Sequence, residues 1–257
     1  MEYNPFLPEV RANPYPYYTY LRHHAPVYQV PGVGFWAISR YDDVLFILRN
    51  PQLFSAAIMA YALGGDLNPF PPEAPAMLSS DPPYHTRLRK LANRAFTPRR
   101  IGSLEAHLRQ VAQRLIEPMV ARGECDLIGA LAIPLPVMVI AELLGIPPER
   151  YEEFKRWADD LARSINGAAL TPEDRVQIRQ STTELSAYLR AAIATCRRRP
   201  GDNLISDLVR AEDENQTLNE EEVLSIALIV LIGGAETTTN LIGNAMLALL
   251  DHPGQLA

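Results

Sequence analysis

The longest apolar run in the chain keeps helical spacing from Asn219 to Leu250 and predicts one central helix of about 48 Å, at about 1.5 Å per residue. Asn219 can cap its start, and Glu222, three residues later, can complete a capping box. Pro253 should stop the helix after Asp251. Both ends are therefore set by residue chemistry, and the other predicted elements are arranged around this helix.

The pattern elsewhere is also mainly helical. Apolar residues recur at helical spacing in these further ranges: 13–24, 41–49, 81–96, 103–122, 135–144, 148–166, 171–198 and 202–211. Alternating segments on either side of Pro31 and Gly32 predict a small β-hairpin over 27–39, and the polar residues 211–217 predict a connector. Residues 55–80 are apolar but rich in Gly and Pro, which favours a binding loop, with disorder as the alternative. The expected fold is mainly α with a small N-terminal β-hairpin region, in a single domain over residues 1–257.

The middle of the central helix is unusual, because Gly233 and Gly234 interrupt a strong helix former at a cost of roughly 1 kcal/mol per glycine. Missing side chains let a flat ligand approach the backbone. Thr237 can donate a hydrogen bond back to the Gly233 carbonyl and so open a groove beside Glu236. Two alternatives remain: the glycines could admit a neighbouring helix, or the run could span a membrane, where Glu236 would be costly.

The composition is that of an ordinary globular protein, with 257 residues of which 47% are hydrophobic and 21% charged. The net charge of -6 argues against nucleic acid as a partner. Cys125 and Cys196 are too few for a disulfide framework and wrongly spaced for a zinc cluster, which fits a reducing compartment. The opening residues show neither a basic start nor an apolar run, so we expect no signal peptide or anchor and a cytoplasmic location.

A basic helix early in the chain carries further candidate chemistry. His85 and Arg89 stand four residues apart and share a face, with Arg87, Lys90 and Arg94 distributed around them. A solvated basic surface is the simpler interpretation. The alternative is that His85 and Arg89 bind an anionic ligand, because a guanidinium matches a carboxylate in bidentate fashion.

Three segments together resemble one known family. They read LIGGAETTTN in the central helix, DPPYHTRLRKLANRAF around His85, and CDLIGALAIPLPVMVIAELLGIP from Cys125 onward. Taken in their order along the chain, they are similar to the cytochrome P450 superfamily of haem-thiolate monooxygenases, and most similar to its soluble bacterial members. The resemblance runs the whole length of the chain and implies a cytochrome P450-like helical fold, with heme (iron protoporphyrin IX) as the cofactor.

For the central helix, the resemblance implies that it crosses one face of the haem. Gly233 and Gly234 would then be cofactor-binding residues. Glu236 and Thr237 match the acid and alcohol pair of the family and would be catalytic, delivering protons during oxygen activation.

Other positions take their expected roles from the same resemblance. His85 and Arg89 match the residues that hold the haem propionates, and Ile229 and Ile232 would contact the substrate from one turn before the groove. The apolar loop over 59–78 would cover the groove.

The resemblance also implies partners. The helices around 163–177 would form a mobile lid, and Arg87, Lys90 and Arg94 could dock an acidic electron-transfer protein, although a solvated face is equally consistent. The implied activity is monooxygenation of an apolar small molecule, using dioxygen and electrons from a ferredoxin-like or flavin redox partner. Neither nucleic acid nor a membrane is expected as a partner.

The chain departs from the family pattern in one respect, because it contains neither the family's Glu-x-x-Arg helix nor the loop whose cysteine supplies the axial thiolate to iron. Neither Cys125 nor Cys196 matches that loop, so no metal ligand is expected within this chain. We therefore expect the N-terminal portion of such an enzyme, truncated and inactive alone. The alternatives are a non-catalytic remnant acting as a helical interaction module, and a family member working as an isomerase or peroxygenase.

Overall fold

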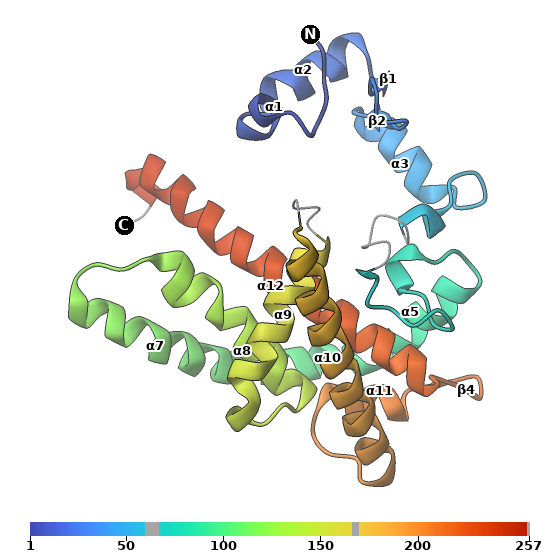
Figure 1. Cartoon of the computed structure of the whole chain (residues 1–257), viewed down its shortest axis with the longest axis vertical. Coiled ribbons are helices and arrows are strands. Elements are labelled where there is room, and N and C mark those ends of the chain that lie inside the picture. The colour runs from blue at the N-terminus through green and yellow to red at the C-terminus, as the bar shows by residue number, and fades with distance from the viewer. Residues whose placement is uncertain (60–66, 166–169, 256–257) are drawn as a thin grey trace. The chain divides into compact units, whose positions relative to one another are not determined.

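The computed structural model describes residues 1–59, 67–165 and 170–255, and the chain divides into two compact units, residues 1–56 and 57–257 (Figure 1). Each unit is described by itself, and the single domain expected from the sequence stays a prediction. Helices dominate both units, so the expected fold class is confirmed.

The first unit contains the predicted β-hairpin between short helices. Its elements are α1 (Pro8–Ala12), α2 (Tyr15–His24), β1 (Val27–Gln29), β2 (Trp36–Ile38) and α3 (Tyr41–Arg49). The strands are antiparallel, with Val27 opposite Ile38 and Gln29 opposite Trp36. A small core forms around Leu21, which is buried together with Tyr3, Val10 and Val30.

The second unit is a helical assembly with one further hairpin. Its elements are η3 (Met77–Ser79), α5 (Tyr84–Ala95), α6 (Pro98–Ser103), α7 (Glu105–Arg122), η4 (Ile128–Ala132), α8 (Pro134–Leu144), η5 (Pro148–Arg150), α9 (Tyr151–Ile165), α10 (Pro172–Arg198), α11 (Leu204–Arg210), β3 (Glu212–Asp213), β4 (Gln216–Thr217), α12 (Glu220–Asp251) and η6 (Pro253–Gln255). A short η1 (Ala56–Ile58) lies at the boundary between the units. Gly123 and Gly145 end α7 and α8 in the left-handed conformation, as their positions predict.

Two local expectations were wrong. The helix expected to begin at Asp81 begins at Tyr84 with Pro83 as its N-cap, because a residue before proline, here Pro82, is disfavoured in the helical conformation. Residues 211–217, expected to be a polar connector, form the β3–β4 hairpin. Glu214 and Asn215 at its turn have φ of 50° and 61°, the positive values that a two-residue hairpin turn requires.

The helix α12 is the long central helix predicted from the sequence, and its capping box is present. The Asn219 side chain accepts a hydrogen bond from the Glu222 N–H at 2.9 Å, and the Glu222 carboxylate accepts one from the Asn219 N–H at 3.0 Å. Its first half is buried, packing against α8, α9, α10 and α11 in the view of Figure 1. In its second half Leu241 and Leu247 are 67% and 61% exposed.

By length and apolarity α12 could cross a membrane, a property that the core helices of soluble proteins share. The buried residues Val223 to Leu228 place its first half inside the helical unit. The core interpretation of this half therefore has direct structural support, and the absence of a membrane partner stays a prediction.

The helices α9 and α10 are joined by a polar network along their shared face. Glu184 of α10 accepts hydrogen bonds from Arg156 at 2.6 Å and from the Trp157 indole at 2.9 Å. Asp160, which is buried, accepts a hydrogen bond from the Ser181 hydroxyl at 2.6 Å. The pKa of Glu184 is lowered from 4.5 to about 2, first by the hydrogen bond from Arg156 and then by that from Trp157.

This lowered pKa gives a pH-dependent stability. Because the folded-state pKa lies below the ordinary value, the carboxylate stabilises the fold above about pH 4.5 and loses this effect as the pH falls toward 2. Glu184→Gln should therefore lower the free energy of unfolding, measured with urea, more at pH 7 than at pH 3. Asp159→Asn, which removes the exposed Lys155–Asp159 pair, is the control and should change little at either pH. Equal losses at both pH values in Glu184→Gln would rule out this carboxylate as the source.

Candidate active site between α5 and α12

A pocket of about 340 Å³ lies between α5 and α12. Each helix contributes residues spaced three or four apart, so one stripe of each helix faces the space. The lining residues are Met77, Arg89, Ala92, Asn93, Phe96, Ile226, Ile229, Val230, Gly233 and Gly234. The walls are therefore mainly apolar, and Arg89 is the charged side chain among these residues.

The two adjacent glycines of α12, Gly233 and Gly234, have different surroundings. A Cβ atom built on Gly233 would meet no other atom within 4 Å, so this glycine leaves open space beside the helix. A Cβ on Gly234 would lie 2.7 Å from Cδ1 of Ile140, a buried residue of α8. Gly234 therefore admits a neighbouring helix, and Gly233 keeps the pocket open. The packing interpretation therefore holds at Gly234, whereas the approach of a flat ligand at Gly233 stays a prediction.

The acid and alcohol lie just beyond the pocket. Thr237 Oγ1 donates a hydrogen bond to the Gly233 carbonyl, as the sequence predicts. Thr237 is exposed, and Glu236 is half-buried with no hydrogen bond or ion pair to any residue in the described part of the chain. Neither residue lines the pocket. Their catalytic role stays a prediction.

The predicted anion-binding pair is only partly brought together. Arg89 lines the pocket, is exposed, and makes no hydrogen bond or ion pair with the residues that the structure describes. His85 lies one turn earlier in α5, is half-buried, and does not line the pocket. A guanidinium without a partner beside an apolar pocket is available to bind an anionic group.

Of the two predicted substrate contacts, Ile229 lines the pocket and Ile232 does not. Sequence reasoning missed Asn93, four residues after Arg89 on the same stripe of α5, and Phe96, the C-cap residue of that helix. It also missed Ile226, three residues before Ile229. Helical spacing from Arg89 and from Ile229 could have found these positions.

The other basic residues of α5 are paired within the unit. Arg94 forms an ion pair with Asp213 at 2.6 Å, and Lys90 contacts both Asp213 and Glu214. These contacts raise the pKa of Lys90, through its hydrogen bond with Asp213 first. Arg87 binds Glu222 of α12. These cations are therefore neither free nor simply solvated, which weakens the expectation that they dock an acidic partner.

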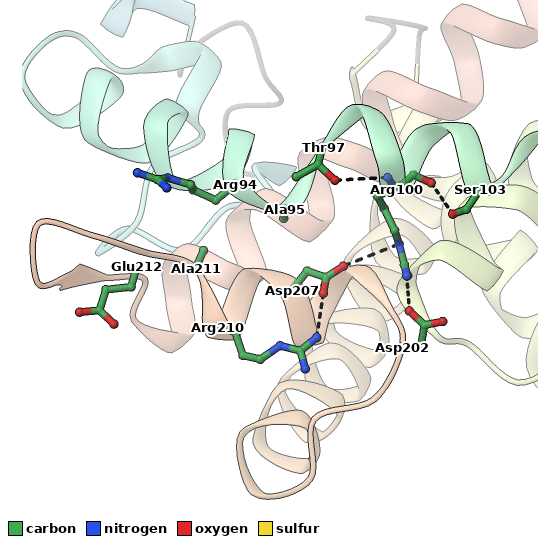
Figure 2. A pocket seen from close by; sticks show the side chains of 10 residues that line it. All are labelled: Arg94, Ala95, Thr97, Arg100, Ser103, Asp202, Asp207, Arg210, Ala211 and Glu212. Atoms are coloured by element: carbon green, nitrogen blue, oxygen red, sulfur yellow. Dashed lines mark hydrogen bonds and ion pairs between the residues drawn. The ribbon is translucent and has the colours of Figure 1, made fainter.

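A larger cavity of about 650 Å³ lies beside α6 and α11, and four of its charged side chains are paired with one another (Figure 2). Arg100 reaches Asp202 and Asp207, and Arg210 donates a hydrogen bond to Asp207 at 2.8 Å. We therefore assign this cavity a structural role between the two helices.

The described residues contain no cluster of three His, Cys, Asp or Glu side chains able to hold a metal. Cys125 is exposed, and Cys196 is buried with its sulfur 3.7 Å from the Asn203 side-chain oxygen. Neither cysteine is among the pocket-lining residues named above. Residues 60–66 of the expected covering loop and 166–169 of the expected lid lie outside the described residues.

Comparisons with known proteins agree with the resemblance seen in the sequence. No protein-family model matches the chain. Cytochrome P450 monooxygenase PikC of Streptomyces venezuelae is 39% identical over 256 residues, covering 96% of this chain and 58% of that protein. Cyclomarin C epoxidase CymV of Salinispora arenicola is 36% identical, covering 92% of this chain and 60% of that protein.

Solved structures agree with these sequence relatives. The structure of cytochrome P450 CYP109Q5 from Chondromyces apiculatus has a TM-score of 0.83 at 38% identity, covering 97% of this chain and 61% of that one. CalO2 has a TM-score of 0.86 at 30% identity, covering 99% of this chain and 64% of that one.

The class of protein to which this sequence and fold are similar is the cytochromes P450 of bacteria. The chain spans about three fifths of the length of the curated relatives named here. The cofactor of this family is haem.

The contrast between the glycines can be measured. Gly233→Ala should leave the free energy of unfolding unchanged or raise it by up to roughly 1 kcal/mol, because alanine favours a helix and the space is open. Gly234→Ala should lower it by about 1–3 kcal/mol, because its Cβ meets Ile140 in a packed core. Adding Ile140→Val, which removes Cδ1, should restore part of that loss. Urea denaturation measures all three variants, and equal effects at the two glycines would show that Gly234 is not a packing position.

Proposed function

We propose that this chain forms part of a haem-dependent monooxygenase that inserts one oxygen atom from dioxygen into an apolar small molecule, with electrons from an external ferredoxin-like or flavin partner. The observation that carries the proposal is the pocket between α5 and α12, where apolar walls, the unpaired Arg89 and the open side of Gly233 meet. These features fit a flat, apolar ring with carboxylate groups at its edge. The similarity to cytochromes P450 supports the same cofactor.

Each residue at the pocket has a role in this proposal. The Arg89 guanidinium binds a propionate carboxylate, with His85 contributing from one turn earlier. Gly233 lets the ring approach the backbone of α12, and Gly234 lies beside it in the pocket wall. Ile229 presents apolar surface to ring and substrate, and excludes water.

Haem, when bound, supplies the oxygen-activating chemistry of the family. The chain's own residues manage the protons. Thr237, one turn beyond Gly233, positions a water molecule with its hydroxyl, and the half-buried Glu236 carboxylate resupplies the proton. Ile232, on the same helix, adds to the apolar contact with substrate.

A second candidate function is a helical interaction module. It is favoured by the exposed leucines of the second half of α12, Leu241, Leu247 and Leu250, which leave apolar side chains open to a partner. It requires no ligand in the pocket, so haem binding distinguishes the two.

Arg89 gives the direct test of the pocket. Titrating the chain with hemin and following the Soret absorbance should show binding that Arg89→Met weakens about 10-fold or more, because a charge-assisted hydrogen bond is lost. Arg94→Met, on the side of α5 that contacts Asp213, should bind like the unchanged chain. Equal affinities for the two variants would separate hemin binding from this pocket, and the absence of any binding would favour the interaction module.

The type of complex is also predictable. Because neither Cys125 nor Cys196 is among the pocket-lining residues, the chain with hemin, reduced under carbon monoxide, should show no Soret band of the thiolate type. Cys125→Ser and Cys196→Ser should each leave the spectrum unchanged. A thiolate-type band that disappears in one of the cysteine variants would show that this chain supplies an axial ligand.

A further inference from the structure

The carboxylate of Glu222 joins α12 to α5 at one end of the pocket. Its side chain is 4% exposed, and each of its two carboxylate oxygens makes a contact. One oxygen accepts the Asn219 N–H of the capping box at 3.0 Å, and the other binds the guanidinium of Arg87. A capping box needs the first contact alone. The second contact reaches a different helix.

Further groups contact the Arg87–Glu222 ion pair. Arg87 donates a second hydrogen bond to the Thr217 carbonyl at 3.4 Å, and its guanidinium lies 5.5 Å from the centre of the Tyr84 ring. The Tyr84 hydroxyl is buried close to Glu222. Its pKa is raised by burial first and then by Glu222. The Thr217 carbonyl and the Tyr84 side chain therefore flank the ion pair at the start of α12.

The Glu222 end of the ion pair lies on the same stripe of α12 as the pocket-lining residues. On α12, Glu222 lies four residues before Ile226, and the same stripe continues through Ile229 to Gly233, about 16 Å along the helix. On α5, Arg87 and Arg89 are two residues apart and so point about 200° apart around the helix axis. One side of α5 is held by Glu222 while the other side presents Arg89 to the pocket.

We infer that Glu222 is a positioning residue for the pocket: through Arg87 it fixes α5 against α12 and so sets where the Arg89 guanidinium meets an anionic ligand. This inference rests on the proposed function, because the ligand at Arg89 is taken to be the haem carboxylate. Glu222 acts through α5 and does not line the pocket itself.

The chain offers a matched pair of substitutions. Glu222→Gln keeps an acceptor for the capping box and removes the charge that binds Arg87. Glu221→Gln removes the same charge from the same turn of α12, but its partner is Arg190 of α10, so α5 is untouched. Effects of the helix dipole are equal in the two variants.

The experiment measures hemin affinity by Soret titration of the full chain and of its variants. Glu222→Gln should weaken binding about 3- to 10-fold and raise amide hydrogen exchange across α5, whereas Glu221→Gln should do neither. Combining Glu222→Gln with Arg89→Met should weaken binding no further than Arg89→Met alone, because the group being positioned is already absent. Arg87→Lys, which keeps the charge, should retain most of the affinity.

Other outcomes overturn the inference. If Glu222→Gln binds hemin as Glu221→Gln does, or if its loss adds fully to that of Arg89→Met, α5 is placed by apolar packing and Glu222 serves only as a cap. If Glu222→Gln does not fold, the double variant Glu222→Gln with Arg87→Met takes its place in the experiment, because it leaves no unpaired buried charge. The same loss of hemin affinity is expected from the double variant. If the unchanged chain does not bind hemin, the pocket proposal itself fails and this inference fails with it.

Discussion

The structure depends on the packing of the first half of α12, which must serve at once as core and as pocket wall. Its residues from Val223 to Leu228 are buried, and Leu231 extends the buried side by another turn. The same turns present Ile226 and Ile229 to the pocket. A helix that is apolar nearly all round can do both, since every side finds apolar surroundings.

At Gly233 and Gly234, one residue serves the packing of the core and the other serves the pocket wall. On the α8 side the helix needs a close crossing, and only a residue without Cβ allows Ile140 to pack there. On the pocket side the missing side chain leaves space that α5 does not fill. The helix-forming propensity lost at two adjacent glycines is thus offset by packing at one and by an opening at the other.

Much of the architecture could be predicted because it depends on residues that are close together in the sequence. Asn219 with Glu222 and Thr171 with Asp174 form the capping boxes that set two helix starts. The pocket was harder, since it depends on which stripes of α5 and α12 face each other. Arg89 and Ile229 were found through the family resemblance, and helical spacing from them reaches Asn93, Phe96 and Ile226. The Arg87–Glu222 contact arises from the long-range pairing of two helices, which spacing within either one does not specify. The β3–β4 hairpin was missed because its strands are two residues long, too short for an alternating pattern.

That hairpin changes the electrostatic character of the surface on α5. Asp213 and Glu214 lie against Lys90 and Arg94, so the positive charges of the helix are balanced at short range by carboxylates from the same chain. An approaching acidic protein would meet a nearly neutral face whose field fades within a few ångströms. Encounter at this face would therefore be governed by shape and by apolar contact, and its rate would respond only weakly to ionic strength.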